Sequence, residues 1–312
     1  MRTVSLKLLA AVLMLSCPAV AQDRPLVEDL GVGSTEAPKK VSFPYDPLPT
    51  DQWVGEEFIF LPQSMRYPLC RKQGQPESKS LAYNEAVGRI GVVQKLEVAK
   101  LVKTTIHLKM KDTGEILTCT TYSDSKQISF MGLGLVKDIV LARKRYEGNS
   151  YYANQRIFYT YDPSTDKWGK LEVKRFSPLK VAKVSAGTQA HSPVRVVVET
   201  EDGRQGFFEM PFSGTNNTMD TFLGFDFYLL EKDPHTQHKW SKKVWKAIEE
   251  GYVLIGMTEA QMKMAMPSPI SVTTNVSKRG EISIWRFYKL TVTTFRGKVE
   301  SATVHSTRQR IP

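Results

Sequence analysis

A strand, an acidic turn with glycine and a second strand occur in the same order at two places in this chain, and this pattern constrains the fold most. The first copy is Thr105–Met110 followed by Asp112-Thr113-Gly114, and the second is Val194–Val198 followed by Glu201-Asp202-Gly203. Alternating apolar residues around such a turn are typical of an antiparallel hairpin. The sequence therefore predicts a chain that is mainly β and contains two related units.

The residues that precede these hairpins also correspond loosely. Phe58–Leu61 matches Ile139–Ala142, and Gly91–Val98 matches Gly169–Phe176. We therefore expect two β repeats, at residues 53–130 and 131–214, each with about five short strands. That size suits a small barrel or sandwich, and the arrangement is similar to bacterial Src-homology-3-like barrels.

Residues 1–21 have the organisation of a secretory signal peptide. Arg2 and Lys7 precede a short apolar run, and small residues end the segment at Ala21. Such a segment directs export, and we expect its removal by cleavage after Ala21. The alternative is a lipoprotein signal in which Cys17 becomes the acylated first residue. No later segment has about 18 uninterrupted apolar residues, so we expect no transmembrane helix.

The segments before and after the expected repeats differ from them in composition. Residues 22–52 are rich in proline, glycine and charged residues, which predicts an extended linker. Residues 215–240 are interpreted as a second linker. Beyond it, Ser241 and Thr258 are placed to cap two short helices, which end at a glycine and at a proline.

Three strands are expected after these helices, at Ile270–Val276, Glu281–Phe295 and Lys298–His305. With the two helices they make an α-α-β-β-β module at residues 241–312. The predicted fold class is therefore mainly β, with two small barrel-like repeats followed by a small α+β module.

The middle strand of this module has two apolar faces. Ile282, Ile284, Tyr288, Leu290 and Val292 share the face that we expect to pack on the helices. The other face carries the aromatic pair, which either packs against the β repeats or forms an exposed binding patch. The candidate binding residues are Trp285 and Phe287.

Four stretches within Val253–Val304 form a recognisable pattern: Gly256–Met262, Pro269, Trp285–Tyr288 and Phe295–Val299. The pattern resembles the SmpA/OmlA domain of outer-membrane assembly lipoproteins, the BamE type. It departs from that family at the end of the second helix, where Met-Pro-Ser-Pro replaces Leu-Gly-x-Pro. The resemblance implies a small module that binds other proteins and has no catalysis of its own.

Two cysteines, Cys70 and Cys119, remain after export, and both lie in the expected first repeat. In an oxidising compartment a single pair of this kind can close one disulfide across a long loop. The alternative is two buried free thiols. We take the disulfide as the working hypothesis.

The chain is basic, with 43 Lys and Arg residues, 32 Asp and Glu residues and a formal net charge of +11. Such a charge favours anionic partners, here an anionic cell-wall polymer or a membrane surface with peripheral association. Basic and aromatic residues interleave from Arg143 to Arg156, as they do on nucleic-acid-binding surfaces. No zinc-finger spacing or ribonucleoprotein motif accompanies them, so no specific nucleic-acid partner is expected.

Motifs of the common catalytic sites do not occur in the sequence. It has no Gly-x-Ser-x-Gly elbow, no phosphate-binding glycine loop and no His-Glu-x-x-His helix. His235 and His238, near Asp233, are weak candidates for metal ligands, because their spacing on a loop does not place both imidazoles on one face. We therefore expect no catalytic residue, no resident metal and no cofactor.

Together these features favour a non-catalytic, multi-domain binding protein of the bacterial envelope, periplasmic or secreted. Its expected partners are envelope proteins or cell-wall polymer. Two alternatives remain open. An outer-membrane assembly-type lipoprotein requires acylation at Cys17, and a metal-dependent cell-wall hydrolase requires a metal ion at His235 and His238.

Overall fold

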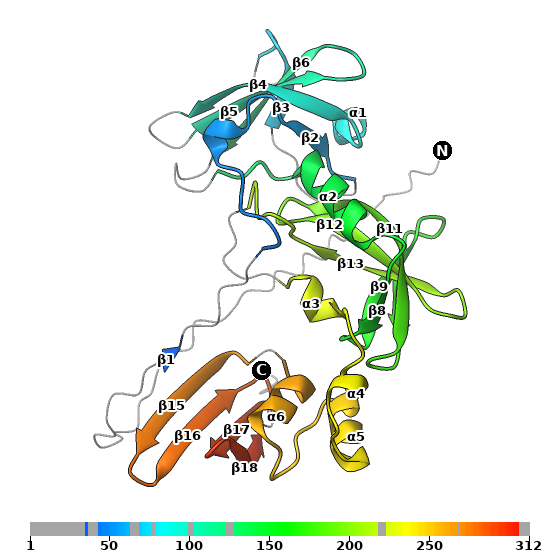
Figure 1. Ribbon diagram of the computed structural model, residues 1–312. Coiled ribbons are helices and arrows are strands. Elements are labelled where there is room, and N and C mark those ends of the chain that lie inside the picture. Colours follow the sequence, from blue (N-terminus) through cyan, green and yellow to red (C-terminus); the bar gives the residue numbers. More distant parts are fainter. Residues whose placement is uncertain are drawn as a thin grey trace, which may run out of the picture.

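The part of the chain that the structure describes contains three antiparallel sheets, which follow one another along the sequence except that residues 35–36 join the last one (Figure 1). The computed structural model describes residues 35–36, 43–62, 69–76, 79–98, 103–122, 128–217, 223–267 and 269–305. The expected signal peptide, with Cys17, and most of the expected N-terminal linker lie outside the described residues. Within the described part the fold is mainly β, and the sheets are curled. The mainly β character agrees with the sequence prediction.

The first sheet has six strands around a core that includes Trp53, Phe58 and Phe130. Across the sheet their order is β3 (Leu69–Lys72), β6 (Ile116–Tyr122), β5 (Lys103–Met110), β4 (Ile90–Val98), β2 (Glu57–Phe60) and β7 (Leu133–Leu135). A short helix, α1 (Tyr83–Ala86), precedes β4.

The predicted hairpin in this sheet is confirmed. Strands β5 and β6 pair from Lys103 with Tyr122 to Lys109 with Ile116. Gly114 in the turn has a φ of 72°, a conformation that residues with a side chain rarely adopt. The sheet also extends past the expected limit at residue 130, because β7 pairs with β2.

A helix, α2 (Val136–Tyr146), follows β7 directly and buries Ile139 and Ala142. These two residues belong to the segment that the sequence matched to strand Phe58–Leu61, so that correspondence is wrong. Apolar residues lie on both sides of α2, so this segment is a short apolar run in the sequence. A run of this length does not by itself distinguish a strand from a buried helix.

The second sheet has seven strands. Their order is β10 (Lys167–Glu172), β9 (Ile157–Asp162), β13 (Gln205–Met210), β12 (Ser192–Glu199), β11 (Pro178–Gln189), β8 (Ser150–Ala153) and β14 (Leu229–Leu230). Its core contains Phe158, Val196 and Phe208 and is continuous with Ile139 and Tyr146 of α2.

The two sheets share one strand order. The first reads β7-β2-β4-β5-β6-β3, and the second reads β14-β8-β11-β12-β13-β9 with β10 added at its edge. In this comparison the hairpin β5–β6 corresponds to β12–β13, in which Gly203 has a φ of 81° at the turn. The strand that corresponds to β2 is β8, not the segment within α2.

The C-terminal sheet has the order β1-β15-β16-β17-β18 and packs on two helices. The helices are α5 (Lys242–Glu250) and α6 (Glu259–Ala265); the strands are β1 (Thr35–Glu36), β15 (Ser271–Ser277), β16 (Gly280–Arg286), β17 (Leu290–Phe295) and β18 (Lys298–Val304). The expected strand Glu281–Phe295 is thus two strands.

A turn at Tyr288 and Lys289 divides these two strands. The backbone N–H of Phe287 donates to the carbonyl oxygen of Leu290 at 2.7 Å, and Arg286 then pairs with Thr291. The turn contains no glycine, proline, asparagine or aspartate, which are the residues that mark turns in a sequence. The expected three-strand module is therefore wrong in its strand count.

The ends of both C-terminal helices follow the expected capping chemistry. The Ser241 hydroxyl accepts from the backbone N–H of Val244, and Gly251 ends α5 with a φ of 77°. Thr258 and Gln261 form a complete capping box at the start of α6. Two short helices, α3 (Phe225–Tyr228) and α4 (Pro234–Gln237), lie in the preceding segment.

A buried polar loop joins the first two sheets. The Asn216 amide donates to the carbonyl oxygens of Phe130 (2.9 Å) and Leu133 (2.7 Å), and its Oδ1 accepts from the backbone N–H of Phe130 (2.6 Å). In the same loop, the Ser213 hydroxyl donates to Oδ2 of Asp138 in α2 at 2.8 Å. The segment expected to be a linker from residue 215 therefore begins as part of this junction.

Candidate binding surface

The expected binding residues Trp285 and Phe287 are core residues. Each side chain is 7 % exposed and packs among the helix residues of the C-terminal core. The Trp285 indole N–H donates to Thr294 Oγ1 at 3.2 Å, and Lys263 Nζ lies 4.6 Å from the ring centroid. In β16 the face that carries them packs on the helices, which reverses the expected orientation, and Ile282 is exposed. Val292 in β17 belongs to the helix-facing core, as expected. Alternation alone separates two faces and does not say which one is buried.

Cys70 and Cys119 form a disulfide between neighbouring strands β3 and β6. Their Cα atoms are 4.0 Å apart, and the two residues are direct partners in the register. Both side chains are buried. Neither is therefore a free thiol that could act as a nucleophile.

The candidate metal ligands His235 and His238 have separate partners. His235 Nδ1 lies 2.8 Å from Asp233 Oδ1, and its Nε2 lies 2.8 Å from Glu249 Oε1. Partial burial lowers the pKa of His235, but the hydrogen bonds to Glu249 and Asp233 outweigh it, so the pKa lies above its ordinary value. His238 instead stacks on Trp240, with ring centroids 4.2 Å apart. Within the described residues no group of three or more His, Cys, Asp and Glu side chains is placed to hold a metal ion.

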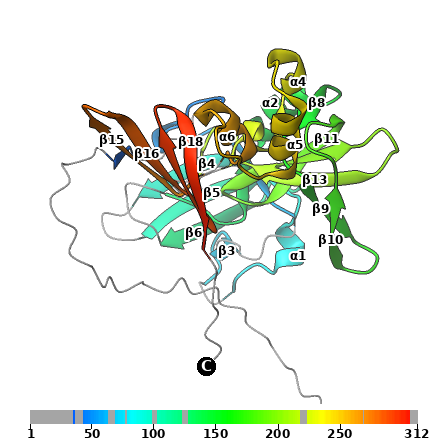
Figure 2. The ribbon, with the colours of Figure 1, turned by 90° about the horizontal axis from the view of Figure 1, so that it is seen from below.

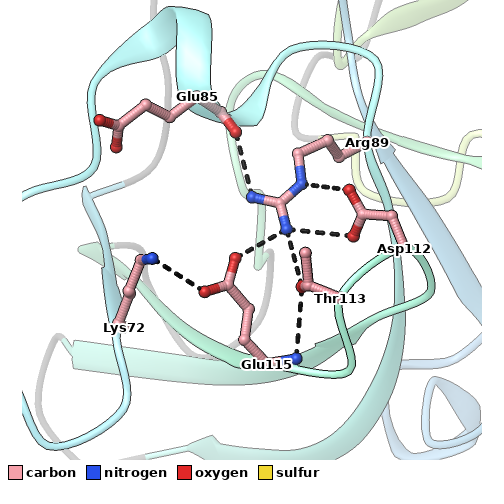
Figure 3. A network of polar contacts seen from close by, with 6 residues as sticks. All are labelled: Lys72, Glu85, Arg89, Asp112, Thr113 and Glu115. Atoms are coloured by element: carbon pink, nitrogen blue, oxygen red, sulfur yellow. Dashed lines mark hydrogen bonds and ion pairs between the residues drawn. The ribbon is translucent and has the colours of Figure 1, made fainter.

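The densest charged network lies in the first sheet around Arg89 (Figure 3). Its guanidinium binds both carboxylate oxygens of Asp112 (2.7 and 3.0 Å) and also Glu115 Oε1 (2.7 Å), while Lys72 reaches the second oxygen of Glu115 (3.1 Å). Nη1 donates to the carbonyl oxygen of Glu85 at 3.1 Å. The charges neutralise one another, so this network fixes the β5–β6 turn and offers no free charge to a ligand.

The basic and aromatic segment after Arg143 is divided by the fold. Tyr146 and Tyr151 are buried in the core of the second sheet, and the three basic residues before Tyr146 lie in the last turn of α2. Arg156 lies beyond β8 and is exposed. The segment therefore does not form a continuous basic and aromatic surface.

A hollow of about 540 Å³ lies where the N-terminal segment crosses the end of α2. Apolar side chains such as Phe43 and Phe225 line it together with charges of both signs. Arg145 and Lys232 are matched there by Asp226 and Glu231. This mixture does not point to one class of ligand.

An exposed group of aromatic rings lies on the hairpin β9–β10, and we call Tyr159, Tyr161 and Trp168 the aromatic platform. Trp168 is 58 % exposed and Tyr159 is 54 % exposed. The Trp168 ring lies 5.2 Å from the Tyr161 ring and 6.5 Å from the Tyr159 ring, measured between centroids. Phe207 of β13 packs behind both Tyr159 and Trp168. Large apolar rings exposed side by side in this way commonly mark a binding surface.

Strand pairing places the platform residues on one face. Trp168 pairs directly with Tyr161, and Lys170 pairs with Tyr159. Side chains of directly paired residues lie on the same side of a sheet, and Tyr159 and Tyr161 are two positions apart on one strand. Phe158, the residue before Tyr159, points into the core instead and is 1 % exposed.

The turn of this hairpin is held by its own polar side chains. Asp162 accepts hydrogen bonds from the Ser164 backbone N–H (2.9 Å), the Ser164 hydroxyl (2.7 Å) and the Thr165 hydroxyl (2.8 Å). Bonds from Ser164 and Thr165 hold the pKa of Asp162 below its ordinary value. The Tyr161 hydroxyl donates to Asp166 at 2.8 Å, which fixes the orientation of that ring. The platform is therefore preorganised.

A groove of about 520 Å³ lies at the other end of the same hairpin, and we call it the basic groove. It is lined by Arg156, Ile157, Glu172, Val173, Lys174 and Arg204. Ile157 lies two positions from Tyr159 on β9 and pairs with Glu172, so the groove continues from the platform. Figure 2 shows the hairpin projecting on the side of the molecule away from β15–β18.

Sequence reasoning missed the platform, although a signal was present. The stretch Ile157-Phe158-Tyr159-Thr160-Tyr161 alternates, and the turn residues Asp162-Pro163-Ser164 follow it directly. Trp168 comes after that turn. A hairpin with aromatic residues on its outer face could have been predicted from this order, but burial of the inner face could not.

Comparisons of the chain with models of protein families, with curated proteins and with solved structures found no match. In the described part of the chain no helix is long and apolar enough to span a membrane.

Proposed function

We propose that this protein is a non-catalytic, exported binding protein of the bacterial envelope, and that the aromatic platform binds cell-wall glycan. The observation that carries the proposal is the exposure of Trp168 beside Tyr159 and Tyr161. Trp53, Trp245 and Trp285 are buried, whereas Trp168 is 58 % exposed on a strand with a preorganised turn. Burying such a large apolar ring against a partner is favourable, and leaving it in water is not.

Glycan fits this surface because a sugar ring has an apolar face and polar edges. The apolar C–H face can stack on an aromatic ring while the hydroxyl groups stay in water or bind polar neighbours. Lys170 beside Tyr159 supplies such a polar neighbour. The Cys70–Cys119 disulfide fits an oxidising compartment, periplasmic or extracellular, where cell-wall polymer is present.

For the C-terminal module we propose a relationship to SmpA/OmlA domains. We also propose that the module contacts envelope proteins. Two features of the resembling segment support the relationship: the capping box of Thr258 and Gln261, and the β17–β18 hairpin at Arg296 and Gly297. Because Trp285 and Phe287 are buried, any such contact uses other residues of the module.

Sedimentation with insoluble cell-wall sacculi tests the proposed function. The purified mature protein should sediment with sacculi, and Trp168→Ala and Tyr159→Ala should each weaken binding by at least about tenfold, equivalent to about 1.4 kcal/mol. Tyr122→Ala is the matched control, because Tyr122 is 61 % exposed on the first sheet, away from the platform. Melting temperatures should stay unchanged in all three variants. Wild-type protein that stays in the supernatant, or equal binding by all variants, would refute the proposal.

A further inference from the structure

The side chains that line the basic groove carry an excess of positive charge. Of the six residues that line it, Arg156, Lys174 and Arg204 are cationic, and Glu172 is the carboxylate. All four side chains are exposed. An excess of one charge in a concave site favours a ligand of the opposite charge.

Two of these cations have no partner among the residues that the structure describes. Arg204 Nε forms an ion pair with Asp202 at 2.8 Å. Among the described residues, by contrast, neither the Arg156 nor the Lys174 side chain has a hydrogen-bond or ion-pair partner. Both are therefore available to an anionic group, and Arg156 can bind a carboxylate through two parallel hydrogen bonds.

The groove and the platform form one continuous strip along the hairpin. The pairs Trp168 with Tyr161, Lys170 with Tyr159 and Glu172 with Ile157 follow one another on the same face. From Trp168 to Glu172 this face extends about 13 Å, because each strand residue advances roughly 3.3 Å. A linear polymer that stacks on the rings therefore passes directly into the groove.

We infer that the ligand is an anionic glycan, whose rings stack on the aromatic platform and whose acidic groups bind Arg156 and Lys174 in the basic groove. The inference rests on the proposed function and names its ligand class. Glu172 lines the same groove, but Arg156 and Lys174 outnumber it, so the acidic groups of the ligand meet the protein at these two cations.

A matched pair of soluble polymers tests the inference. Hyaluronate is a linear carboxylated glycan, and its methyl ester has the same backbone without the charge. The wild-type protein should bind hyaluronate at least tenfold more tightly than the ester at low ionic strength. Arg156→Gln combined with Lys174→Gln should abolish this preference by weakening only the binding of hyaluronate. Trp168→Ala should weaken the binding of both polymers.

The control removes the same charge from the same sheet outside the groove. Lys180→Gln combined with Lys183→Gln, both on exposed positions of β11, should leave the preference for hyaluronate unchanged. An equal loss in this control would show diffuse attraction to the basic protein and overturn the inference.

The remaining outcomes separate the inference from the proposed function. Equal binding of hyaluronate and its ester, with loss of both in Trp168→Ala, would overturn the anionic ligand and leave glycan binding intact. No binding of either polymer would overturn both. Aromatic and basic surfaces also bind single-stranded nucleic acid, so tighter binding of oligodeoxythymidylate than of hyaluronate would overturn the glycan as ligand.

Discussion

The guanidinium group of Arg175 donates a hydrogen bond of 3.0 Å to the carbonyl oxygen of Ile248, near the C-terminal end of α5. The same nitrogen donates to the carbonyl oxygen of Ala265, at the end of α6, also at 3.0 Å. Arg175 belongs to the second β unit, between β10 and β11, and is 8 % exposed. One buried cation thus satisfies the ends of both helices, where the helix dipoles favour positive charge. Burial lowers the pKa of Arg175 to about 10, which leaves it charged at neutral pH.

Replacing Arg175 should loosen the C-terminal module from the second sheet. Arg175→Leu removes the donor to the buried carbonyl of Ala265 and leaves the carbonyl of Ile248 with only the bond from the Gly251 backbone N–H (3.2 Å). A buried polar group that loses its partner costs roughly 1 to 3 kcal/mol. We expect the free energy of unfolding to fall by at least about 2 kcal/mol, measured by urea denaturation with tryptophan fluorescence. Lys246→Gln, which removes an exposed cation from α5, is the control. Equal stability of both variants would contradict the role given to Arg175.

Asp138 should make the protein less stable as the pH rises from about 4 to about 6. Burial raises its pKa to about 6 from the ordinary 3.8, against the lowering effect of the Ser213 hydrogen bonds and of Lys137. In this range the folded chain keeps a proton that the unfolded chain has released, so folding becomes less favourable as the pH increases. The cost reaches about 3 kcal/mol at neutral pH, since one pKa unit corresponds to roughly 1.4 kcal/mol.

The variant Asp138→Asn isolates this effect. The asparagine side chain keeps an oxygen that can accept a hydrogen bond from Ser213, and it has no carboxyl group that could ionise. We expect it to match the wild type near pH 4 and to exceed it in stability at pH 7, in urea denaturation at both values. Lower stability of Asp138→Asn at pH 7 would show that the ionised carboxylate stabilises the junction.

The Arg89 network should give the opposite pH dependence: its contribution to stability is lost as the pH falls into the acid range. Hydrogen bonds from Arg89 hold the pKa values of Asp112 and Glu115 below their ordinary range, and Lys72 adds to the effect on Glu115. The network stabilises the fold above the carboxylates' unfolded pKa values, and this contribution is lost as the pH falls through the folded ones. Arg89→Met should therefore flatten the fall of the melting temperature below about pH 4. Lys111→Met, which breaks the nearby exposed pair with Glu57, should leave that fall nearly unchanged; a steep acid fall retained by Arg89→Met would contradict the assignment.

Removal of the disulfide should destabilise the first sheet. Cys70 and Cys119 are separated by 49 positions in the sequence, and the chain-entropy model assigns about 4 kcal/mol to closing a loop of this length. Cys70→Ala combined with Cys119→Ala should lower the free energy of unfolding by up to that amount. Reducing agent should shift the urea midpoint of the wild type and have no effect on the double variant. A wild type insensitive to reductant after full unfolding would mean that the bridge does not constrain the chain.

Sequence reasoning succeeded where a structural choice depends on a few neighbouring residues. The hairpin turns at Gly114 and Gly203 and the helix ends at Ser241, Gly251 and Thr258 lie where expected. It failed at the turn of Tyr288 and Lys289, which carries no turn residue. There the backbone turns because Trp285 and Val292 both pack on the same helices, a requirement that local propensity does not contain.

The predictions of candidate site residues likewise succeeded in one case and failed in another. The sequence identified Cys70 and Cys119 as a pair, because only these two cysteines remain after export and an oxidising compartment favours a disulfide between them. It chose Trp285 and Phe287 as binding residues and missed Trp168 and Tyr159. All four are aromatic residues in strand-forming segments, and only burial distinguishes them.

Local patterns in the sequence specify a mainly β chain with capped C-terminal helices, because caps, turn glycines and alternating apolar residues act through local geometry. Which face of each strand is buried, the strand order shared by the first two sheets and the meeting of Arg175 with two helix ends follow from tertiary contacts. These features depend on contacts between residues far apart in the chain. Such contacts gain their free energy only when the surfaces meet and exclude water, so no local pattern records them.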